Sequence, residues 1–247
     1  MIAILGRLRR AAPPAPHTGA FASAAASHVG RVRRVNEDRT LDRPDRGLWA
    51  VADGMGGMAR GDLAAETAIA ALSALADRGA VDEEGVADAI AEADHRLRAD
   101  PAMQGGGTTI VVLLATAAGA TLFWAGDSRA YRLEAARAVP LTRDHSLVAD
   151  LVAAGLIEAV AADNHPQANV VTRALGAGDP APVERLRIDF APGERLMLAS
   201  DGCYRSLAPG DAPLNLGIED CAARLVANAV ARDGSDNASC VVVERRA

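Results

Sequence analysis

The chain has 247 residues, of which 50% are hydrophobic, 23% charged and 3% aromatic. This length and composition suffice for the core of one large domain or two small ones and are too apolar for a disordered chain. The 26 basic and 32 acidic residues give a formal net charge of −6, which is not the basic excess that binds nucleic acids or anionic membranes. We therefore expect neither nucleic acid nor a membrane as a partner.

All 26 basic residues are arginines, because the sequence contains no lysine. Schiff-base enzymes, P-loop nucleotide hydrolases and protein kinases depend on a lysine, so these classes are excluded in their usual forms. The three cysteines, Cys203, Cys221 and Cys240, are widely spaced and form no C-x-x-C pair. This spacing argues against a disulfide framework or a zinc site and favours a reducing compartment, so we expect a cytoplasmic protein.

The order of the segments predicts one domain over residues 18–247, preceded by a poorly ordered leader at residues 1–17. The leader has an apolar run before its arginines, which is the reverse of a secretory signal. Helices are expected from a cap at Asp62 to about residue 76, after Asp82 to about residue 97, and over 218–231. Strands are expected at 21–29, 47–52, 107–115, 120–125, 129–133, 183–190, 194–200 and 238–244. Many hairpin-like strands with adjacent helices predict an α+β fold with antiparallel sheet.

Two further segments need separate interpretation. Residues 101–126 carry no charge and are long enough to span a bilayer, but glycines at 105–107 and 119 interrupt them. Their β-rich runs instead predict two buried strands. Residues 140–178 combine a short helix-like run at 146–155 with polar loop residues, and they are expected to form an insertion over the sheet, here called the flap.

Acidic residues stand at the ends of four apolar strands. Asp53, Asp127 and Asp201 follow predicted strands, and Asp236 precedes the last one. One such acid is usually a turn former or a helix cap. Four of them, gathered at the edge of a buried sheet, would repel one another and lose hydration unless cations lay among them. Because no histidine or cysteine cluster is nearby in the sequence, oxygen ligands favour Mg²⁺ or Mn²⁺ over zinc, and no EF-hand loop indicates calcium.

The loop after Asp53 also allows a different interpretation. Gly54, Gly56 and Ala59 satisfy the G-x-G-x-x-A form of a dinucleotide-binding fingerprint between a strand and a helix. That helix should lead into a second parallel strand, but the sequence instead predicts another helix. The context therefore argues against a dinucleotide site.

A set of short motifs in fixed order resembles the metal-dependent protein phosphatases, the type 2C serine/threonine phosphatases, in their short bacterial form. The resemblance extends from about residue 20 to 245. The motifs are GRVRRVNED at 30–38, DGMGG at 53–57, GGTT at 106–109, GDSRAY at 126–131, LTRDHSL at 141–147, His165-Pro166, TRALG at 172–176, SDG at 200–202 and DNAS at 236–239. The resemblance implies a central antiparallel β-sandwich flanked by pairs of α-helices, with a metal cluster in a cleft at one end.

The resemblance also implies a role for individual residues. Asp53 would bridge two metal ions, the Gly54 carbonyl would bind one of them, and Asp201 and Asp236 would bind the other. Asp127, sharing Asp201, would help to hold a third, weaker ion. Glu37 and Asp38 would be outer-sphere acids that hold metal-bound waters. Asn237 would support the site, and Arg33 would bind the substrate phosphate.

These residues suit phosphoryl transfer to water. Two divalent ions about 4 Å apart can deprotonate a bridging water and direct it in line at phosphorus. A guanidinium fork donates two hydrogen bonds to two phosphate oxygens, as expected for Arg33. Eukaryotic members place a histidine after the Asp-Gly as general acid, but Met55 stands there in this chain, so the general acid stays open. His145 and His165 are assigned to the flap.

We expect a monomeric phosphatase that acts on phosphoserine and phosphothreonine proteins and opposes a bacterial Ser/Thr kinase, with Mn²⁺ or Mg²⁺ as cofactor. Two alternatives stay open. A non-catalytic phosphoprotein-binding regulatory module would usually lack ligand acids, whereas Asp53, Asp127, Asp201 and Asp236 are all retained. A hydrolase of small phosphate esters would share the same chemistry and differ only at the surface and flap.

Overall fold

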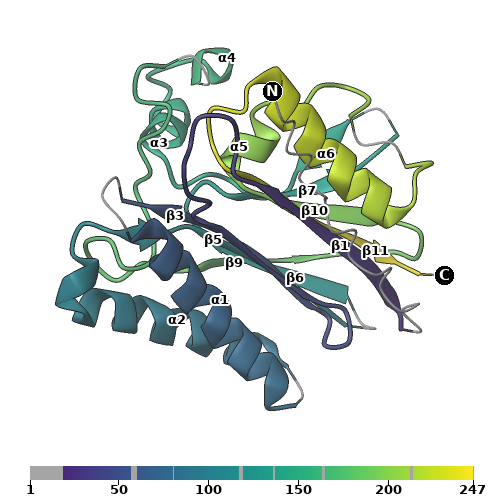
Figure 1. Cartoon of the computed structure of the whole chain (residues 1–247), viewed down its shortest axis with the longest axis horizontal. Coiled ribbons are helices and arrows are strands. Elements are labelled where there is room, and N and C mark those ends of the chain that lie inside the picture. The colour runs from purple at the N-terminus through teal and green to yellow at the C-terminus, as the bar shows by residue number, and fades with distance from the viewer. Residues whose placement is uncertain are drawn as a thin grey trace, which may run out of the picture.

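The computed structural model describes residues 19–56, 60–79, 81–116, 119–135, 137–162, 165–211 and 214–246. The predicted leader at residues 1–17 lies outside this range. Two antiparallel sheets face each other, and helices cover their outer faces (Figure 1). This arrangement confirms the predicted α+β sandwich flanked by helices.

The first sheet carries the helical pair α1 and α2 on its outer face. Its strands lie in the order β2, β3, β5, β6 and β9, and the short β4 pairs with β3. The bounds are β2 (Asp38–Arg43), β3 (Leu48–Met55), β4 (Gly107–Thr108), β5 (Ile110–Thr116), β6 (Gly119–Ala125), β9 (Glu184–Ile188), α1 (Gly61–Asp77) and α2 (Glu83–Ala99). Between α2 and β4 lies the 3-10 turn η1 (Pro101–Met103).

The second sheet lies against α6, with the four-residue helix α5 packed beside it. Its strand order is β1, β11, β10, β7 and β8. The bounds are β1 (Phe21–His28), β11 (Ala238–Arg245), β10 (Arg195–Ala199), β7 (Arg129–Leu133), β8 (Ala138–Pro140), α5 (Asp201–Tyr204) and α6 (Ile218–Arg232). The helical layer on this side therefore consists of one long helix and one helical turn.

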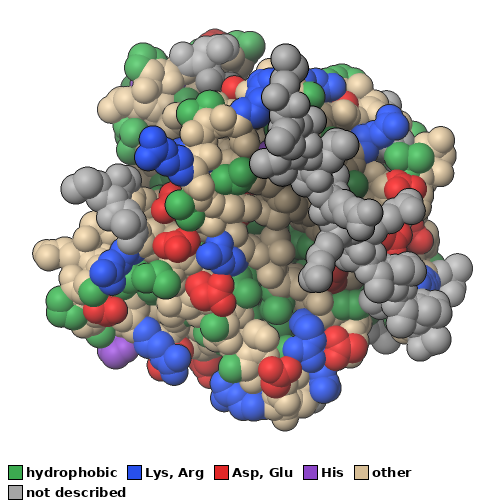
Figure 2. Space-filling model, in the orientation of Figure 1, with side chains coloured by type: hydrophobic (Ala, Val, Ile, Leu, Met, Phe, Trp, Pro, Cys, Tyr) green, Lys and Arg blue, Asp and Glu red, His purple; other side chains and the backbone are tan. Residues whose placement is uncertain are grey.

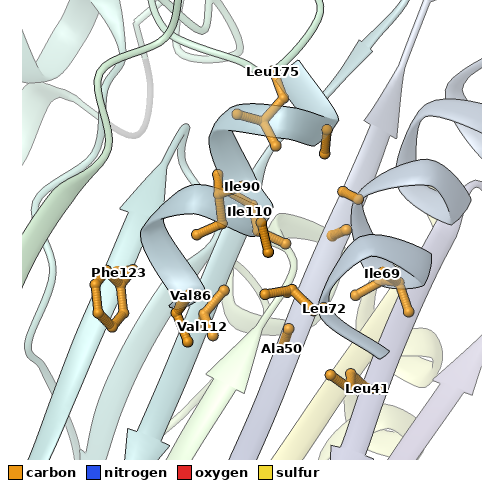
Figure 3. Close-up of a cluster of buried hydrophobic side chains, with 14 of the residues drawn as sticks. Leu41, Ala50, Ile69, Leu72, Val86, Ile90, Ile110, Val112, Phe123 and Leu175 are labelled. Carbon is orange, nitrogen blue, oxygen red and sulfur yellow. The ribbon is translucent and has the colours of Figure 1, made fainter. Parts of the chain in front are cut away.

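The core lies in three apolar layers that follow from the sequence periodicities. One fills the space between α1, α2 and the first sheet, where Leu72, Ile90 and Val112 meet (Figure 3). A second lies between α6 and the second sheet. The third, between the two sheets, includes Trp49 and Leu198, both fully buried. Strands that are apolar on both faces, such as β5, are those that contribute to two of these layers.

Several predicted boundaries were wrong for local reasons. The strand expected at 107–115 is divided at Thr109, where the backbone amide donates instead to the Asp53 carbonyl. β2 and β8 were missed because β2 is a charged edge strand and β8 has only three residues. Asp62 is not the cap of α1: Arg60 occupies that position, and Asp62 lies in the first turn.

No helix within the described residues is long and apolar enough to cross a membrane. The uncharged stretch at 101–126 instead forms η1, β4 and the hairpin of β5 and β6, as predicted. On the face shown in Figure 2, blue arginines and red acids are interspersed over the region of α1 and α2. This mixture is typical of an ordinary solvated surface.

The flap carries two short helices, α3 (Leu147–Ala153) and α4 (Ala159–Ala162). Figure 1 shows them beyond the ends of the strands rather than on an outer face of the sandwich. Two isolated bridges, Ser146 with Val171 and Thr108 with Leu175, join the flap to itself and to β4. The flap therefore lies at the same end of the sandwich as the end of β3.

Substitution of Leu72 tests the packing of α1 on the first sheet. Leu72 is 1% exposed and lies in the layer between helices and sheet, so Leu72→Ala should lower the free energy of unfolding by about 2–5 kcal/mol. Leu63→Ala on the same helix, where the side chain is 48% exposed, should change it by only about 0.5 kcal/mol. Urea unfolding followed by circular dichroism measures both, and equal losses would contradict this packing.

Candidate metal centre

The predicted site residues converge on one cleft of ≈480 Å³ at the end of the sandwich. The predicted residues lining the cleft are Arg33, Glu37, Asp53, Gly54, Asp127, Asp201 and Asp236. Asp38 and Asn237 are both buried next to it, bound to Ser200 and to the Glu37 backbone respectively. Residues from five separate parts of the sequence therefore meet at one place.

Strand pairing explains this convergence. Asp38 and Asp53 lie directly opposite each other in the register of β2 and β3. β10 and β11 pair in the second sheet, so that Asp201 lies two residues after the end of β10 and Asp236 two residues before the start of β11. Asp53 is the third residue from the end of β3, whereas the sequence analysis placed it after the strand. Asp201 is the first residue of α5. Both sheets thus place carboxylates at the same end.

The carboxylates perturb one another because they share a poorly hydrated space. Burial, and then the charges of Asp38 and Asp201, raise the pKa of Asp53 well above its usual value. Burial and the Asp201 charge raise the pKa of Asp127 to about 7. Burial likewise raises the pKa of Asp38 to about 6, despite hydrogen bonds from serine hydroxyls. Burial also raises the pKa values of Asp201 and Glu37.

The donors fit hard divalent cations. Asp38 Oδ1 is buried without a hydrogen-bond partner, and the carboxyls of Asp53 and Asp201 lie close enough for the charge of Asp201 to raise the pKa of Asp53. A partnerless oxygen and two neighbouring carboxyls are costly unless a cation or its waters lie among them. Among the described residues, no group of three acidic, histidine or cysteine side chains is arranged so that it could already hold a metal ion. Oxygen donors around an open cleft suit Mg²⁺ or Mn²⁺, which retain several waters.

Asn237 fixes the loop that carries Arg33. Its Oδ1 accepts a hydrogen bond of 2.8 Å from the Glu37 amide. Its Nδ2 donates to the carbonyls of Val29 and Val35 at 2.9 and 3.0 Å. The loop is thereby held at both ends, and Arg33 extends from it to donate to Asp236 Oδ2 at 2.8 Å.

Gly54 is required by close backbone approach. A Cβ at this position would lie 2.1 Å from the carbonyl oxygen of Gly61, at the start of α1. Any other residue would therefore force β3 and α1 apart at the floor of the cleft. The same close approach leaves the Gly54 backbone at the cleft surface.

Hydroxyl side chains that the sequence analysis did not single out support the carboxylates. Ser200 Oγ donates to Asp38 Oδ2 at 2.8 Å, and Thr109 Oγ1 accepts from the Asp53 amide at 3.2 Å. Thr109 and Ser128 share a further bond of 2.6 Å. All three stand inside the GGTT, GDSRAY and SDG motifs, so their place in those motifs was the available signal.

Two more residues of the cleft were missed. Arg205 lies 3.4 Å from Asp201 Oδ2 and 3.5 Å from Asp127 Oδ2. Asn169 of the flap lines the same cleft and accepts a hydrogen bond from Arg205. The i,i+4 spacing of Asp201 and Arg205 was a weak signal for their pairing. Nothing in the sequence pointed to Asn169.

Neither flap histidine is among the residues that line the cleft. His145 is buried at the root of the flap, where its Nδ1 accepts a hydrogen bond from the Gly126 amide at 3.1 Å and its ring stacks on Trp124. Burial lowers the pKa of His145, so the neutral ring serves as an anchor. His165 Nδ1 accepts from the Gln167 amide in a turn of the flap.

Comparison with known proteins identifies the family. The family model for Protein phosphatase 2C matches residues 26–237. A serine/threonine phosphatase, stp, of Listeria innocua is 31% identical over 233 residues, covering 87% of this chain and 92% of the relative. The chain therefore belongs to the protein phosphatase 2C family, and it is a serine/threonine phosphoprotein phosphatase.

Solved structures agree with this family. The phosphatase MsPP of Mycobacterium smegmatis, in complex with cacodylate, has a TM-score of 0.82 and 33% identity, covering 92% of this chain and 99% of that one. The catalytic domain of the phosphatase PstP, in complex with two manganese ions, has a TM-score of 0.78 and 29% identity, covering 92% and 99%. Both resemblances extend over nearly the whole of this chain.

The raised pKa values predict an unusual pH dependence of stability without metal. An acid whose pKa is raised by folding binds more protons in the folded than in the unfolded state, so its contribution to stability falls as pH rises from about 4 toward the folded value. For Asp127 that window ends at about pH 7. In EDTA, Asp127→Asn should match the wild type near pH 4 and be increasingly more stable up to about pH 7.

Urea unfolding of the wild type and of Asp127→Asn, in EDTA between about pH 4 and pH 7, measures the effect. The exposed Asp220→Asn on α6 controls for the loss of one negative charge and should show no such divergence. A wild type that gains stability over Asp127→Asn as pH rises would contradict the prediction.

Proposed function

We propose that this phosphatase is metal-dependent and that Asp53, the Gly54 carbonyl, Asp201 and Asp236 hold two Mn²⁺ or Mg²⁺ ions. Asp127, with Asp201, provides a weaker third position. The observation that supports this most directly is the group of buried, mutually perturbed carboxylates opening on one cleft. The manganese ions in the PstP structure support the same ion type.

When bound, such ions supply a water of lowered pKa as nucleophile and offset charge on the phosphoryl oxygens. The protein residues position the reactants. Glu37 lines the cleft and Asp38 lies next to it with a buried free oxygen, so both can accept hydrogen bonds from waters of the centre. Ser200 donates to the other oxygen of Asp38, which fixes the orientation of that carboxylate.

Arg33 is placed to bind the substrate phosphate. Its side chain lines the cleft and is 48% exposed, and it is paired with Asp236 on one side only. Its remaining N–H donors are available to two phosphate oxygens in the fork geometry that arginine provides. Attack at phosphorus would then take place between Arg33 and the carboxylates.

The substrates are phosphoserine and phosphothreonine proteins. We further propose that a Ser/Thr kinase of the same cell supplies them, since a phosphoprotein phosphatase needs an opposing kinase. The proposed state is a monomer. The free thiols of Cys203, Cys221 and Cys240 fit a reducing compartment, and the cytoplasm is the proposed location.

Removal of one ligand charge tests the metal centre. Hydrolysis of a phosphothreonine peptide should stop after EDTA treatment and return with Mn²⁺ or Mg²⁺. Asp201→Asn should keep less than about a tenth of the wild-type rate, a barrier increase of more than about 1.4 kcal/mol, with an unchanged circular dichroism spectrum. Asp220→Asn, exposed on α6, is the control and should keep full activity. Activity that persists in EDTA would contradict metal dependence.

Arg33 and its neighbour Arg34 form a matched pair for the phosphate grip. Both are exposed arginines in one loop, but only Arg33 lines the cleft. Arg33→Ala should lower kcat/KM on the phosphopeptide by about 10-fold to 100-fold, because charge-assisted hydrogen bonds to phosphate contribute about 1.5–3 kcal/mol. Arg34→Ala should leave it within about twofold. Equal effects of the two substitutions would exclude a specific grip by Arg33.

A further inference from the structure

Arg205 connects the flap to the carboxylate cluster. Its Nη2 lies 3.4 Å from Asp201 Oδ2 and 3.5 Å from Asp127 Oδ2. The same guanidinium donates to the Asn169 side chain through Nη1 and to the Ala168 carbonyl, at 3.4 Å, through Nη2. One side chain therefore contacts two buried acids and two groups of the flap.

Both acids need a positive partner. The side chains of Asp127 and Asp201 are 6% and 19% exposed, and each raises the pKa of a neighbouring acid. Buried carboxylates that are not neutralised by protons require a nearby cation. Arg205 fills this role from the end of α5, where its amide donates to the Asp201 carbonyl at 3.0 Å and fixes the start of the side chain.

The flap contact falls on a compact turn. The Ala168 amide donates to the His165 carbonyl at 2.9 Å, and the Leu147 amide donates to the Val170 carbonyl at 2.9 Å. The first bond closes the turn at 165–170, and the second joins it to α3 of the flap. Arg205, in contrast, comes from the catalytic end of the second sheet. Release of Arg205 would therefore remove two contacts between the turn and the body of the protein.

We propose that Arg205 is a positioning residue that holds the turn at 165–170 over the cleft, and that a divalent cation between Asp127 and Asp201 displaces it. The two cations would compete because the carboxylates of Asp127 and Asp201 would hold both, and because the cations repel each other at such short range. By linkage, the ion that displaces Arg205 loosens the turn. In the same way, an intact Arg205 contact lowers the affinity of the site for that ion. This inference rests on the proposed metal centre.

Manganese titration of the full chain by isothermal titration calorimetry tests the competition. Arg205→Met keeps an apolar stem and removes every donor, so the weakest Mn²⁺ should bind at least about tenfold tighter. Arg224→Met, exposed on α6, removes the same charge away from the cleft and should match the wild type. Asp127→Asn should lose the weakest ion. Equal affinity of that ion in the two methionine variants would overturn the competition.

Hydrogen exchange of the amides at 165–171 tests the link to the flap. Exchange in the wild type should rise when Mn²⁺ saturates the weakest site, and in Arg205→Met it should be high with and without that ion. Asn169→Ala removes one of the two flap acceptors of Arg205 and leaves the Ala168 carbonyl and both acids in place. It should raise exchange while changing Mn²⁺ affinity less than Arg205→Met does.

Wild-type exchange that does not respond to Mn²⁺ would overturn the link, and this arm needs no substitution. Failure of the inference differs from failure of the proposed metal centre. If the wild type binds no Mn²⁺ at all, both are overturned. If the wild type binds Mn²⁺ and hydrolyses the phosphopeptide but Arg205→Met behaves as Arg224→Met, only the role of Arg205 is lost.

Discussion

Electrostatic repulsion among buried carboxylates is the constraint on which the rest of this structure depends. Asp38 and Asp53 face each other across neighbouring strands, and the charge of a third carboxyl, that of Asp201, also acts on Asp53. In an unconstrained chain these groups would separate and hydrate. They stay together because backbone pairing fixes their positions, so the free energy of the apolar layers maintains an arrangement that repulsion between the charged carboxylates opposes.

The order of the two sheets explains how the scaffold resists this repulsion. β3 and β10 are interior strands, each paired on both sides. Each of these strands contributes side chains to two apolar layers, and a shift of register by one residue would exchange them, placing Trp49 where the small Ala50 packs. The acid of β3 and the acid that follows β10 are thus held by many contacts remote from the site. Short hydrogen bonds then orient the local groups: Asn237 holds the Glu37 backbone, and Ser200 holds the Asp38 carboxylate.

The sequence predicted the features that depend on local pattern. Ile69 and Leu72 on α1, and Ile90 on α2, are buried as their helical spacing indicated, and the acids at strand ends meet as expected. β2 was not predicted because the edge strand DRTLDR lacks apolar alternation. Arg205 and Asn169 lie 36 residues apart, and their contact depends on how the flap folds back. No periodicity records such a contact, because it is a property of tertiary geometry.

Charge balance accounts for the use of two arginines at this cleft. Five aspartates, Asp38, Asp53, Asp127, Asp201 and Asp236, outweigh Arg33 and Arg205, so a cleft without divalent ions would repel a phosphate dianion. Two divalent ions would offset most of this negative charge, so the same cleft would repel the dianion far less. The arginines differ in what they leave free: Arg33 is the more exposed and pairs with one acid, whereas Arg205 spans two acids and the flap. Arg33 can therefore turn to a substrate, while Arg205 moves only if another cation takes its place.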